Sequence, residues 1–430
     1  MAFQQALSGL NSASKAIDAT SHNIANSSTV GYKSASAHFS DVYASSLNGS
    51  GAGQIGIGVS LSAVQQQFTQ GNITSTNNPL DISINGAGFF RMDNNGATTF
   101  TRNGQFHLDK NGYIINDQAM KLTGYAALSG IIVPSTPAPI QISASDLAPV
   151  ATGTNVNSPF QGIKANLNLD SRQTTPATAW TDGPASGPWS PDPQSYNFSR
   201  AVDVYDTLGN AHTLTMYFVK AATAGDWDVY SNVDGATNSR VTLTGGPLHF
   251  DTSGNLASGS PLSVSIDLTG VASDIGTVNN AASPLAFNID FTGTTQFGSS
   301  FGTNRLEQDG YTAGHLVGLS IGDDGVIQGR YSNGQTFAQG QIVLANFTNP
   351  NGLQALGNNQ WSETSTSGPP LVGAPNTANL GVLSSSTVEE SNVDLTAELV
   401  NLITQQRNYQ ANAQSIKTQD QVMQTLVNLR

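Results

Sequence analysis

Three short clusters of acidic residues, asparagine and glycine are the places where the sequence could support metal chemistry. They read DNNG at residues 93–96, DKNG at 109–112 and DDG at 323–325. A calcium loop needs about five or more oxygen ligands, with a bidentate acid near its end. Each cluster is instead followed directly by an alternating apolar and polar stretch, a pattern typical of tight hairpin turns. We therefore predict turns at these positions, and neither a metal site nor a bound cofactor.

Catalytic signatures are missing from the sequence. The six histidines form no H-E-x-x-H or comparable spacing, and we interpret His107 as a packing residue on a strand. The sequence has no G-x-S-x-G elbow, P-loop or dinucleotide fingerprint. The paired carboxylates of a glycosidase leave no sequence pattern because their pairing is spatial, but few acids lie within apolar strands here. We predict that the protein is not an enzyme.

The composition narrows the class of protein. The chain has 430 residues, 44 glycines, no cysteine and a net charge of −13, and only 10% of its residues are charged. Its length allows two or three domains, and without cysteine it has neither disulfides nor thiolate metal sites. Hydrophobic residues reach 38% and alternate in strand-like runs, so the chain should fold. An acidic chain is a poor ligand for nucleic acid or an acidic membrane surface.

The sequence shows no targeting or membrane segment. No unbroken apolar run follows the first positive charge, Lys15, as a signal peptide would require. No apolar run approaches the ~20 residues that span a bilayer. We expect no membrane insertion, and either a cytoplasmic protein or export without a cleaved signal peptide.

The first residues of the chain predict an amphipathic helix. Asn26, Ser27, Ser28 and Gly31 should end it, because they compete with helical hydrogen bonds or favour turns. Its apolar residues recur every three or four positions and form one narrow stripe. These seam residues are Phe3, Leu7, Leu10, Ile17 and Ile24.

The last forty residues predict a much longer helix. Residues 391–430 contain neither proline nor glycine, and Ser391 and Asp394 offer N-cap chemistry. The helix would be roughly 54 Å long. Its apolar seam has the heptad spacing of a coiled coil. The seam residues are Leu395, Leu399, Leu402, Tyr409, Ile416, Met423 and Val427.

A seam so long and narrow needs a helical partner. We predict that the two chain ends pack as one coiled coil, with further partners from other subunits. The alternative is two ordinary surface helices on the β domains. Its weakness is length, because globular helices average about 11–12 residues.

The body between the helices predicts a mainly β fold of nested domains. Strand-like segments and turn signals fill residues 72–147 and 306–360, which we assign to an inner β domain. An outer β domain, 148–305, is inserted into it. Extended connectors at 29–71 and 361–387 join this body to the terminal helical domain, residues 1–28 and 388–430.

Several of these segments resemble bacterial flagellar axial proteins. The N-terminal ALSGLNSASKAIDATSHNIANSSTVGYK and the C-terminal SNVDLTAELVNLITQQRNYQANAQSIKTQDQVMQTLVNLR are similar to the family's terminal signatures. NPLDISINGAGFFRM, TRNGQFHLDKNGYIINDQAMKLTGYA and QGQIVLANFTNPNGLQALGNNQW resemble the rod and hook members. With its inserted middle region, the chain is most similar to the hook members of the family. The resemblance is weakest over residues 148–305.

The resemblance implies a structural subunit of the flagellar hook. Such subunits leave the cell unfolded through the flagellar type III export apparatus and assemble into a curved, flexible tube outside it. The tube is a universal joint that transmits torque from rod to filament. The partners implied are other copies of the chain and the distal rod, hook cap and hook–filament junction proteins. Two alternatives remain open, a distal rod protein and an unrelated β-rich surface fibre or adhesin.

Composition and resemblance together suggest a channel wall on the C-terminal helix. Amide side chains offer neither strong charge nor apolar surface, so an unfolded polypeptide would adhere to them weakly. A plainly solvated face is the alternative. The candidate lining residues are Gln405, Gln410, Asn412, Gln414, Gln419 and Gln421.

Overall fold

The computed structural model describes residues 2–42, 56–143 and 145–428. The chain forms two compact units. The first comprises Met1–Ser143, Gly318–Arg330 and Thr336–Arg430, and the second comprises Ala144–Val317 and Tyr331–Gln335. The second unit is thus inserted into the first. The insertion expected from the sequence was residues 148–305.

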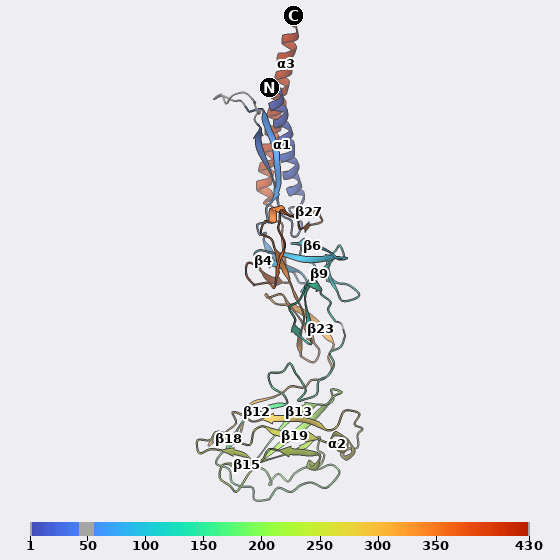
Figure 1. Cartoon of the computed structure of the whole chain (residues 1–430). Coiled ribbons are helices and arrows are strands. Elements are labelled where there is room, and N and C mark those ends of the chain that lie inside the picture. Colours follow the sequence, from blue (N-terminus) through green and yellow to red (C-terminus); the bar gives the residue numbers. More distant parts are fainter. Residues whose placement is uncertain (1, 43–55, 144, 429–430) are drawn as a thin grey trace. The chain divides into compact units, whose positions relative to one another are not determined.

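Two long helices lie side by side at the ends of the chain (Figure 1). They are α1, Ala2–Ala25, and α3, Leu395–Asn428. The Asp394 side chain caps α3, accepting hydrogen bonds from the backbone N–H groups of Thr396 (2.9 Å) and Ala397 (3.1 Å). The prediction of a mainly β chain with paired terminal helices is confirmed.

A β-hairpin covers a second face of α1. Strands β1, Ala35–Val42, and β2, Gly58–Gln66, pair antiparallel and lie along the helix (Figure 1). Asn23 of α1 anchors the first strand of the hairpin. Its side chain accepts a hydrogen bond from the Ala35 N–H (2.8 Å) and donates one to the Ala35 carbonyl (2.9 Å). The described part of the expected connector 29–71 is therefore ordered against the helix, while residues 43–55 lie outside the described residues.

The β body of the first unit is built on one large sheet, in which neighbouring strands are often not consecutive in the chain. Its strands run in the order β23-β24-β25-β9-β5-β6-β28-β27. Short pairs, β3 with β31 and β4 with β30, bring the C-terminal segment alongside the start of the body. The strands are β3 Ile73–Ser75, β4 Ile82–Asn85, β5 Phe89–Asn94, β6 Ala97–Thr101, β7 His107–Leu108, β8 Ile114–Ile115, β9 Lys121–Leu128, β10 Ile131–Ile132, β11 Ala138–Pro139, β23 Leu316–Ile321, β24 Val326–Tyr331, β25 Thr336–Ile342, β26 Leu344–Asn346, β27 Gln354–Gly357, β28 Gln360–Ser362, β29 Leu371–Gly373, β30 Val382–Ser385 and β31 Thr387–Glu389.

The acidic clusters of the sequence form turns, as predicted. Asn95 and Gly96 both have positive φ and join β5 to β6, because this left-handed conformation matches the twist of a two-residue hairpin. Asp109 accepts backbone hydrogen bonds from Asn111 (2.8 Å) and Tyr113 (2.7 Å), and Asp324 accepts one from Val326 (3.1 Å). Their carboxylates stabilise the backbone of the turns.

The second unit has two sheets around one hydrophobic core. One sheet has the order β16-β19-β20-β12-β21 with β22 beside β12, and the other has the order β13-β14-β15-β17-β18. Buried side chains of both sheets, such as Leu167, Phe218 and Trp227, belong to the same core. Its elements are β12 Ile163–Asp170, β13 Phe198–Tyr205, β14 Ala211–Lys220, β15 Asp226–Val233, β16 Val241–Thr244, β17 Leu248–Phe250, β18 Leu256–Ser258, β19 Leu262–Ile266, α2 Leu268–Ile275, β20 Leu285–Asp290, β21 Thr295–Phe297 and β22 Gly302–Gln308.

Candidate assembly surface

The face of α1 that meets α3 is lined by small residues. The amide of Asn412 on α3 lies 2.9 Å from where a Cβ on Gly9 would stand. Residues on the same helical face as Gly9 are buried, which lets the two backbones approach closely. They are Ala6, Ala13, Ala16 and Thr20.

The corresponding face of α3 is half-buried and largely polar. Leu402 and Ile416 are its apolar members, and Tyr409 is 38% exposed between them. The half-buried polar positions on this face are Glu398, Gln405, Asn412 and Gln419, and Ala413 next to Asn412 is half-buried as well. Three of the predicted seam residues, Leu402, Tyr409 and Ile416, therefore lie at or near the contact with α1, whereas Leu399 is exposed and the half-buried position beside it is Glu398.

The predicted seam of α1 lies beside this contact. Leu10, Ile17 and Ile24 are half-buried, but Phe3 and Leu7 are 50% and 42% exposed. Leu7 and Ile17 follow the buried Ala6 and Ala16 by one position, and one residue turns a helix by about 100°. The apolar stripe is thus rotated away from α3.

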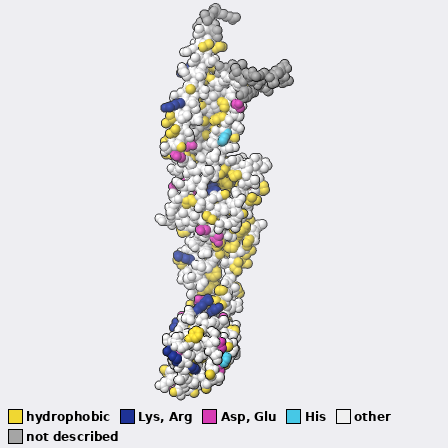
Figure 2. All heavy atoms as spheres, turned by 90° about the vertical axis from the view of Figure 1, so that its left-hand side faces the viewer, with side chains coloured by type: hydrophobic (Ala, Val, Ile, Leu, Met, Phe, Trp, Pro, Cys, Tyr) yellow, Lys and Arg dark blue, Asp and Glu magenta, His cyan; other side chains and the backbone are white. Residues whose placement is uncertain are grey.

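Much of the predicted C-terminal seam is also uncovered within one chain. Leu395, Leu399 and Met423 are 46%, 44% and 61% exposed. The Val427 side chain lies outside the described residues. Figure 2 shows hydrophobic side chains open to view over the helical part of the molecule. A helix with this much apolar surface needs further partners.

Sequence reasoning missed other exposed apolar residues, which lie on α3 and on the β1–β2 hairpin. On α3 they flank the predicted heptad positions, and on the hairpin Phe39 and Leu61 face each other across β1 and β2. On α3, the signal available in the sequence was that these apolar residues lie next to the predicted seam residues. The exposed residues are Val400, Ile403 and Val422 on α3 and Phe39, Leu61 and Val64 on the hairpin.

The six amide residues proposed as a channel wall divide into two sets. Gln405, Asn412 and Gln419 are half-buried on the face toward α1. Gln410, Gln414 and Gln421 are exposed.

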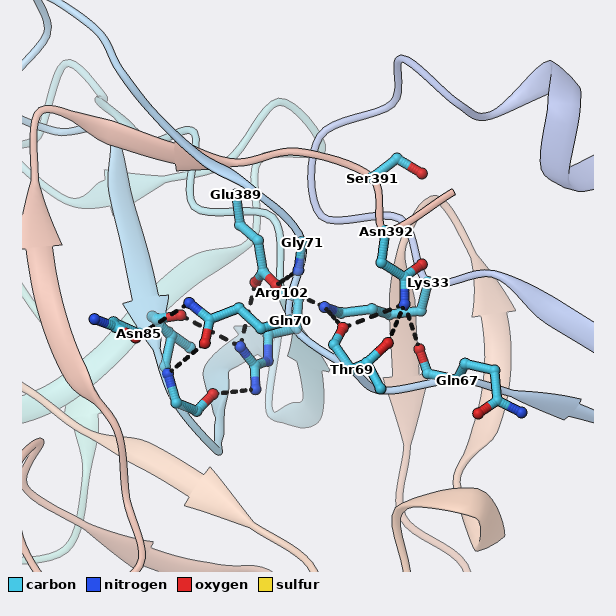
Figure 3. Close-up of polar contacts among 12 residues, drawn as sticks. Lys33, Gln67, Thr69, Gln70, Gly71, Asn85, Arg102, Glu389, Ser391 and Asn392 are labelled. Atoms are coloured by element: carbon cyan, nitrogen blue, oxygen red, sulfur yellow. Dashed lines mark hydrogen bonds and ion pairs between the residues drawn. The ribbon is translucent and has the colours of Figure 1, made fainter. Parts of the chain in front are cut away.

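A buried ion cluster joins these terminal segments to the β body. The Glu389 carboxylate at the end of β31 lies 2.6 Å from the Lys33 ammonium and 3.2 Å from the Arg102 guanidinium. It also accepts a hydrogen bond from the Gly71 N–H at 3.0 Å. Figure 3 shows Lys33, Gly71 and Arg102 converging on this carboxylate. The side chains of Lys33 and Glu389 are completely buried, and that of Arg102 is 4% exposed.

The cluster depends on charge pairing in a desolvated place. Burial lowers the pKa of Lys33, and the neighbouring Glu389 carboxylate opposes that shift by favouring the charged ammonium. The sequence contained only a weak signal for the cluster, namely isolated charges in a chain that carries few. Nothing in their spacing pairs residues so far apart.

Asn392 makes a second set of contacts at the same junction. Its side-chain oxygen accepts from the Ser34 N–H at 2.8 Å, and its amide donates to the Gln67 carbonyl at 2.8 Å and the Thr69 hydroxyl at 2.9 Å (Figure 3). The segment that leads into α3 is thereby tied to both ends of the β1–β2 hairpin.

Within the described residues, no group of three or more histidine, aspartate or glutamate side chains is arranged to hold a metal ion. The interpretation of His107 as a packing residue is wrong. It is exposed, 3.8 Å from Asp117, because β7 is a two-residue strand with no covered face. Of the helices in the described part of the chain, none is long and apolar enough to cross a bilayer.

Four protein-family models match the chain, and together they define the class of protein. They are Flagella basal body rod protein (residues 3–33), Flagellar hook protein FlgE/F/G D1 domain (83–146), Flagellar basal body protein FlaE D2 domain (166–311) and Flagellar basal body rod FlgEFG protein C-terminal (384–429). The helical ends, the first β unit and the inserted unit each correspond to a recognised part of the flagellar rod and hook proteins.

Full-length relatives narrow the class. The chain is 41% identical to the flagellar hook protein FlgE of Escherichia coli (strain K12), with 100% of both chains covered, and 40% identical to that of Salmonella typhimurium over the same shares. It is 31% identical to the FlgE of Borreliella burgdorferi, covering 99% of this chain and 98% of the relative. The chain belongs to the flagellar hook protein FlgE family, a family of structural, non-enzymatic proteins.

A solved structure shares the fold. The crystal structure of Helicobacter pylori flagellar hook protein FlgE2 aligns with a TM-score of 0.50 at 14% identity, covering 74% of this chain and 100% of that one. The rod-protein and adhesin alternatives are set aside, because the hook relatives match over their whole length, inserted unit included.

Proposed function

We propose that the chain polymerises with copies of itself into the tubular hook, through the apolar surfaces that its terminal helices leave uncovered. The observation that carries this is the exposure of Leu395, Leu399, Val400 and Ile403 on one helix. Apolar surface exposed to water does not stabilise a monomer, whereas packing against a helix of a neighbouring subunit would bury it.

We further propose that the tube is curved and flexible and acts as a universal joint, transmitting torque from rod to filament outside the cell. Membership of the hook family supports this, as does the division of each subunit into two units. The family also suggests export through the flagellar type III apparatus without a cleaved signal peptide, and contacts with the distal rod, hook cap and hook–filament junction proteins. A cysteine-free chain suits that route because no disulfide can form before export.

Leu399→Asp tests the assembly surface directly. Leu399 is 44% exposed in the single chain, so the charge should leave the fold of the subunit intact while placing an aspartate in a packed contact between subunits. We expect electron micrographs of the concentrated full chain to show no tubes, with unchanged circular dichroism. Leu402→Asp, at a half-buried position, should weaken both the helix pair and assembly, at a cost of several kcal/mol, roughly 2–5.

Asn408→Asp is the matched control, because it adds the same charge to an exposed position of α3 in an isosteric side chain. It should assemble like the wild type. If both leucine variants form tubes as readily as the wild type, the helices are not the assembly surface.

A further inference from the structure

Glu389 connects segments of the chain that are far apart in the sequence. Lys33 follows α1 and is 356 residues from Glu389. Gly71 lies between β2 and β3, 318 residues away, and Arg102 follows β6, 287 residues away. One carboxylate therefore touches the exit from the N-terminal helix, the return from its hairpin, and the β body.

The charges of the cluster are unequal. Two cations share one carboxylate, and no other acidic side chain of the described residues forms an ion pair with either of them. Their remaining hydrogen-bond partners are neutral carbonyl oxygens, that of Thr69 for Lys33 (2.7 Å) and those of Gly86 (2.7 Å) and Ile84 (3.5 Å) for Arg102. Removing the only anion from a buried ion cluster leaves uncompensated charge, which is far more costly than never having buried the groups.

Backbone hydrogen bonds hold the segments on both sides of Glu389 close together. The Glu389 carbonyl accepts from the Gly31 N–H at 2.8 Å, and the next residue donates its N–H to the Asn72 carbonyl at 2.8 Å. A Cβ on Gly31 would stand 2.6 Å from the Asn103 backbone nitrogen. The backbone of the junction is therefore closely packed around Glu389.

The position of Glu389 in the C-terminal segment determines when the two cations can be paired. Lys33 and Arg102 lie in the N-terminal part of the first unit and Glu389 lies in its C-terminal segment, so a chain whose C-terminal segment has not docked has no carboxylate with which to bury the two cations. We propose that Glu389 is a latch: the junction between the N-terminal segment and the β body stays open until the C-terminal segment docks and brings in the one carboxylate that closes it. This proposal stands independently of the assembly surface.

The test is hydrogen exchange of the full chain, comparing Glu389→Gln with Glu390→Gln. Glu390 is the exposed neighbour, so its substitution removes the same charge one residue away and outside the cluster. Glu389→Gln should speed amide exchange about tenfold or more in residues 26–34 and 67–72, some three hundred residues earlier in the chain. Glu390→Gln should leave these segments at the wild-type rate.

The reactivity of Lys33 gives a second readout. An amine-reactive reagent should modify Lys33 slowly in the wild type and Glu390→Gln, and rapidly in Glu389→Gln. If Glu389→Gln loosens only the residues beside it, or leaves Lys33 as protected as in the wild type, the latch is wrong.

Removing one cation tests whether uncompensated charge is what opens the junction. It also keeps the test informative if Glu389→Gln unfolds altogether. In the Glu389→Gln background, Lys33→Met replaces a buried ammonium with an apolar chain of similar length. A latch that works through charge predicts that this double variant regains protection in residues 67–72. If the double variant is as open as Glu389→Gln alone, uncompensated charge is not what opens the junction and the proposal fails.

Discussion

The amide of Asn412 on α3 occupies the space that a side chain on Gly9 of α1 would fill, at 2.9 Å from its Cβ position. This contact sets how closely the terminal helices approach. A side chain at residue 9 must either displace the flexible amide or separate the helices.

Substitutions at Gly9 should therefore depend on size. Gly9→Ala should be nearly neutral, because alanine favours the helix by about 1 kcal/mol and this gain offsets the shift of one amide. Gly9→Leu should separate the helices, which would appear as faster hydrogen exchange along α1 and loss of tubes in micrographs. A leucine variant with wild-type exchange would show that the contact does not determine the spacing of the helices.

The channel hypothesis now rests on the exposed amides of α3. The chain has no native cysteine, so Gln414→Cys and Gln410→Cys each give a single thiol. If these positions line a channel, a bulky maleimide should label them rapidly in monomers and slowly in tubes. Gln405→Cys should react slowly in both states, because this position is half-buried toward α1.

Ser253→Cys in the second unit is the control, since it is exposed and should react in both states. Rapid labelling of Gln414→Cys in intact tubes would favour a plainly solvated face.

The inserted unit should be removable without loss of assembly. The chain enters and leaves it as an antiparallel pair, with Leu147 donating to the Gly314 carbonyl at 2.7 Å and Val150 to the Tyr311 carbonyl at 3.0 Å. Residues 147 and 314 are thus close enough to be joined by a short Gly-Ser linker after deletion of residues 148–313.

We expect this deletion variant to form tubes that are straight or only loosely curved. A surface rich in serine, threonine and asparagine should make polar contacts that slide, so this unit would control curvature without holding the tube together. Micrographs showing wild-type curvature would assign that control to another part of the subunit. A chain that fails to fold would show that the insertion supports the core of the first unit.

Stability of the second unit should depend on the charge of His212. Its Nδ1 lies 2.7 Å from Asp234, its Nε2 lies 3.5 Å from Asp206, and its side chain is 18% exposed. The hydrogen bond to Asp234 raises the pKa of His212 above its ordinary value, and the nearby Asp206 adds to this. The stabilisation is therefore complete below the unfolded pKa, about 6.5, and is lost as the pH rises through the higher folded pKa.

Urea unfolding followed by tryptophan fluorescence measures this effect, because Trp180, Trp189 and Trp227, three of the four tryptophans, lie in the second unit. His212→Gln should lower the free energy of unfolding by about 1–2 kcal/mol at low pH and by less at high pH. An effect independent of pH would mean that His212 acts as a neutral hydrogen-bonding group.

The sequence by itself determined the two terminal helices and several hairpin turns, but not α2 within the second unit. The absence of proline and glycine from residues 391–430 predicted a long helix, and the Asn-Gly pair at 95–96 predicted a hairpin. These outcomes depend on local propensities and capping, which act over a few residues and are therefore visible in the sequence.

Tertiary structure decided which face of each helix meets the other. The apolar stripe of α1 predicted contact through residues such as Leu7, but the face against α3 is the small-residue face that includes Ala6 and Gly9, because close backbone approach favours small side chains. It also decided the Glu389 cluster. An ion pair between residues 356 apart depends on where the fold brings the chain back to itself, and no local pattern encodes that.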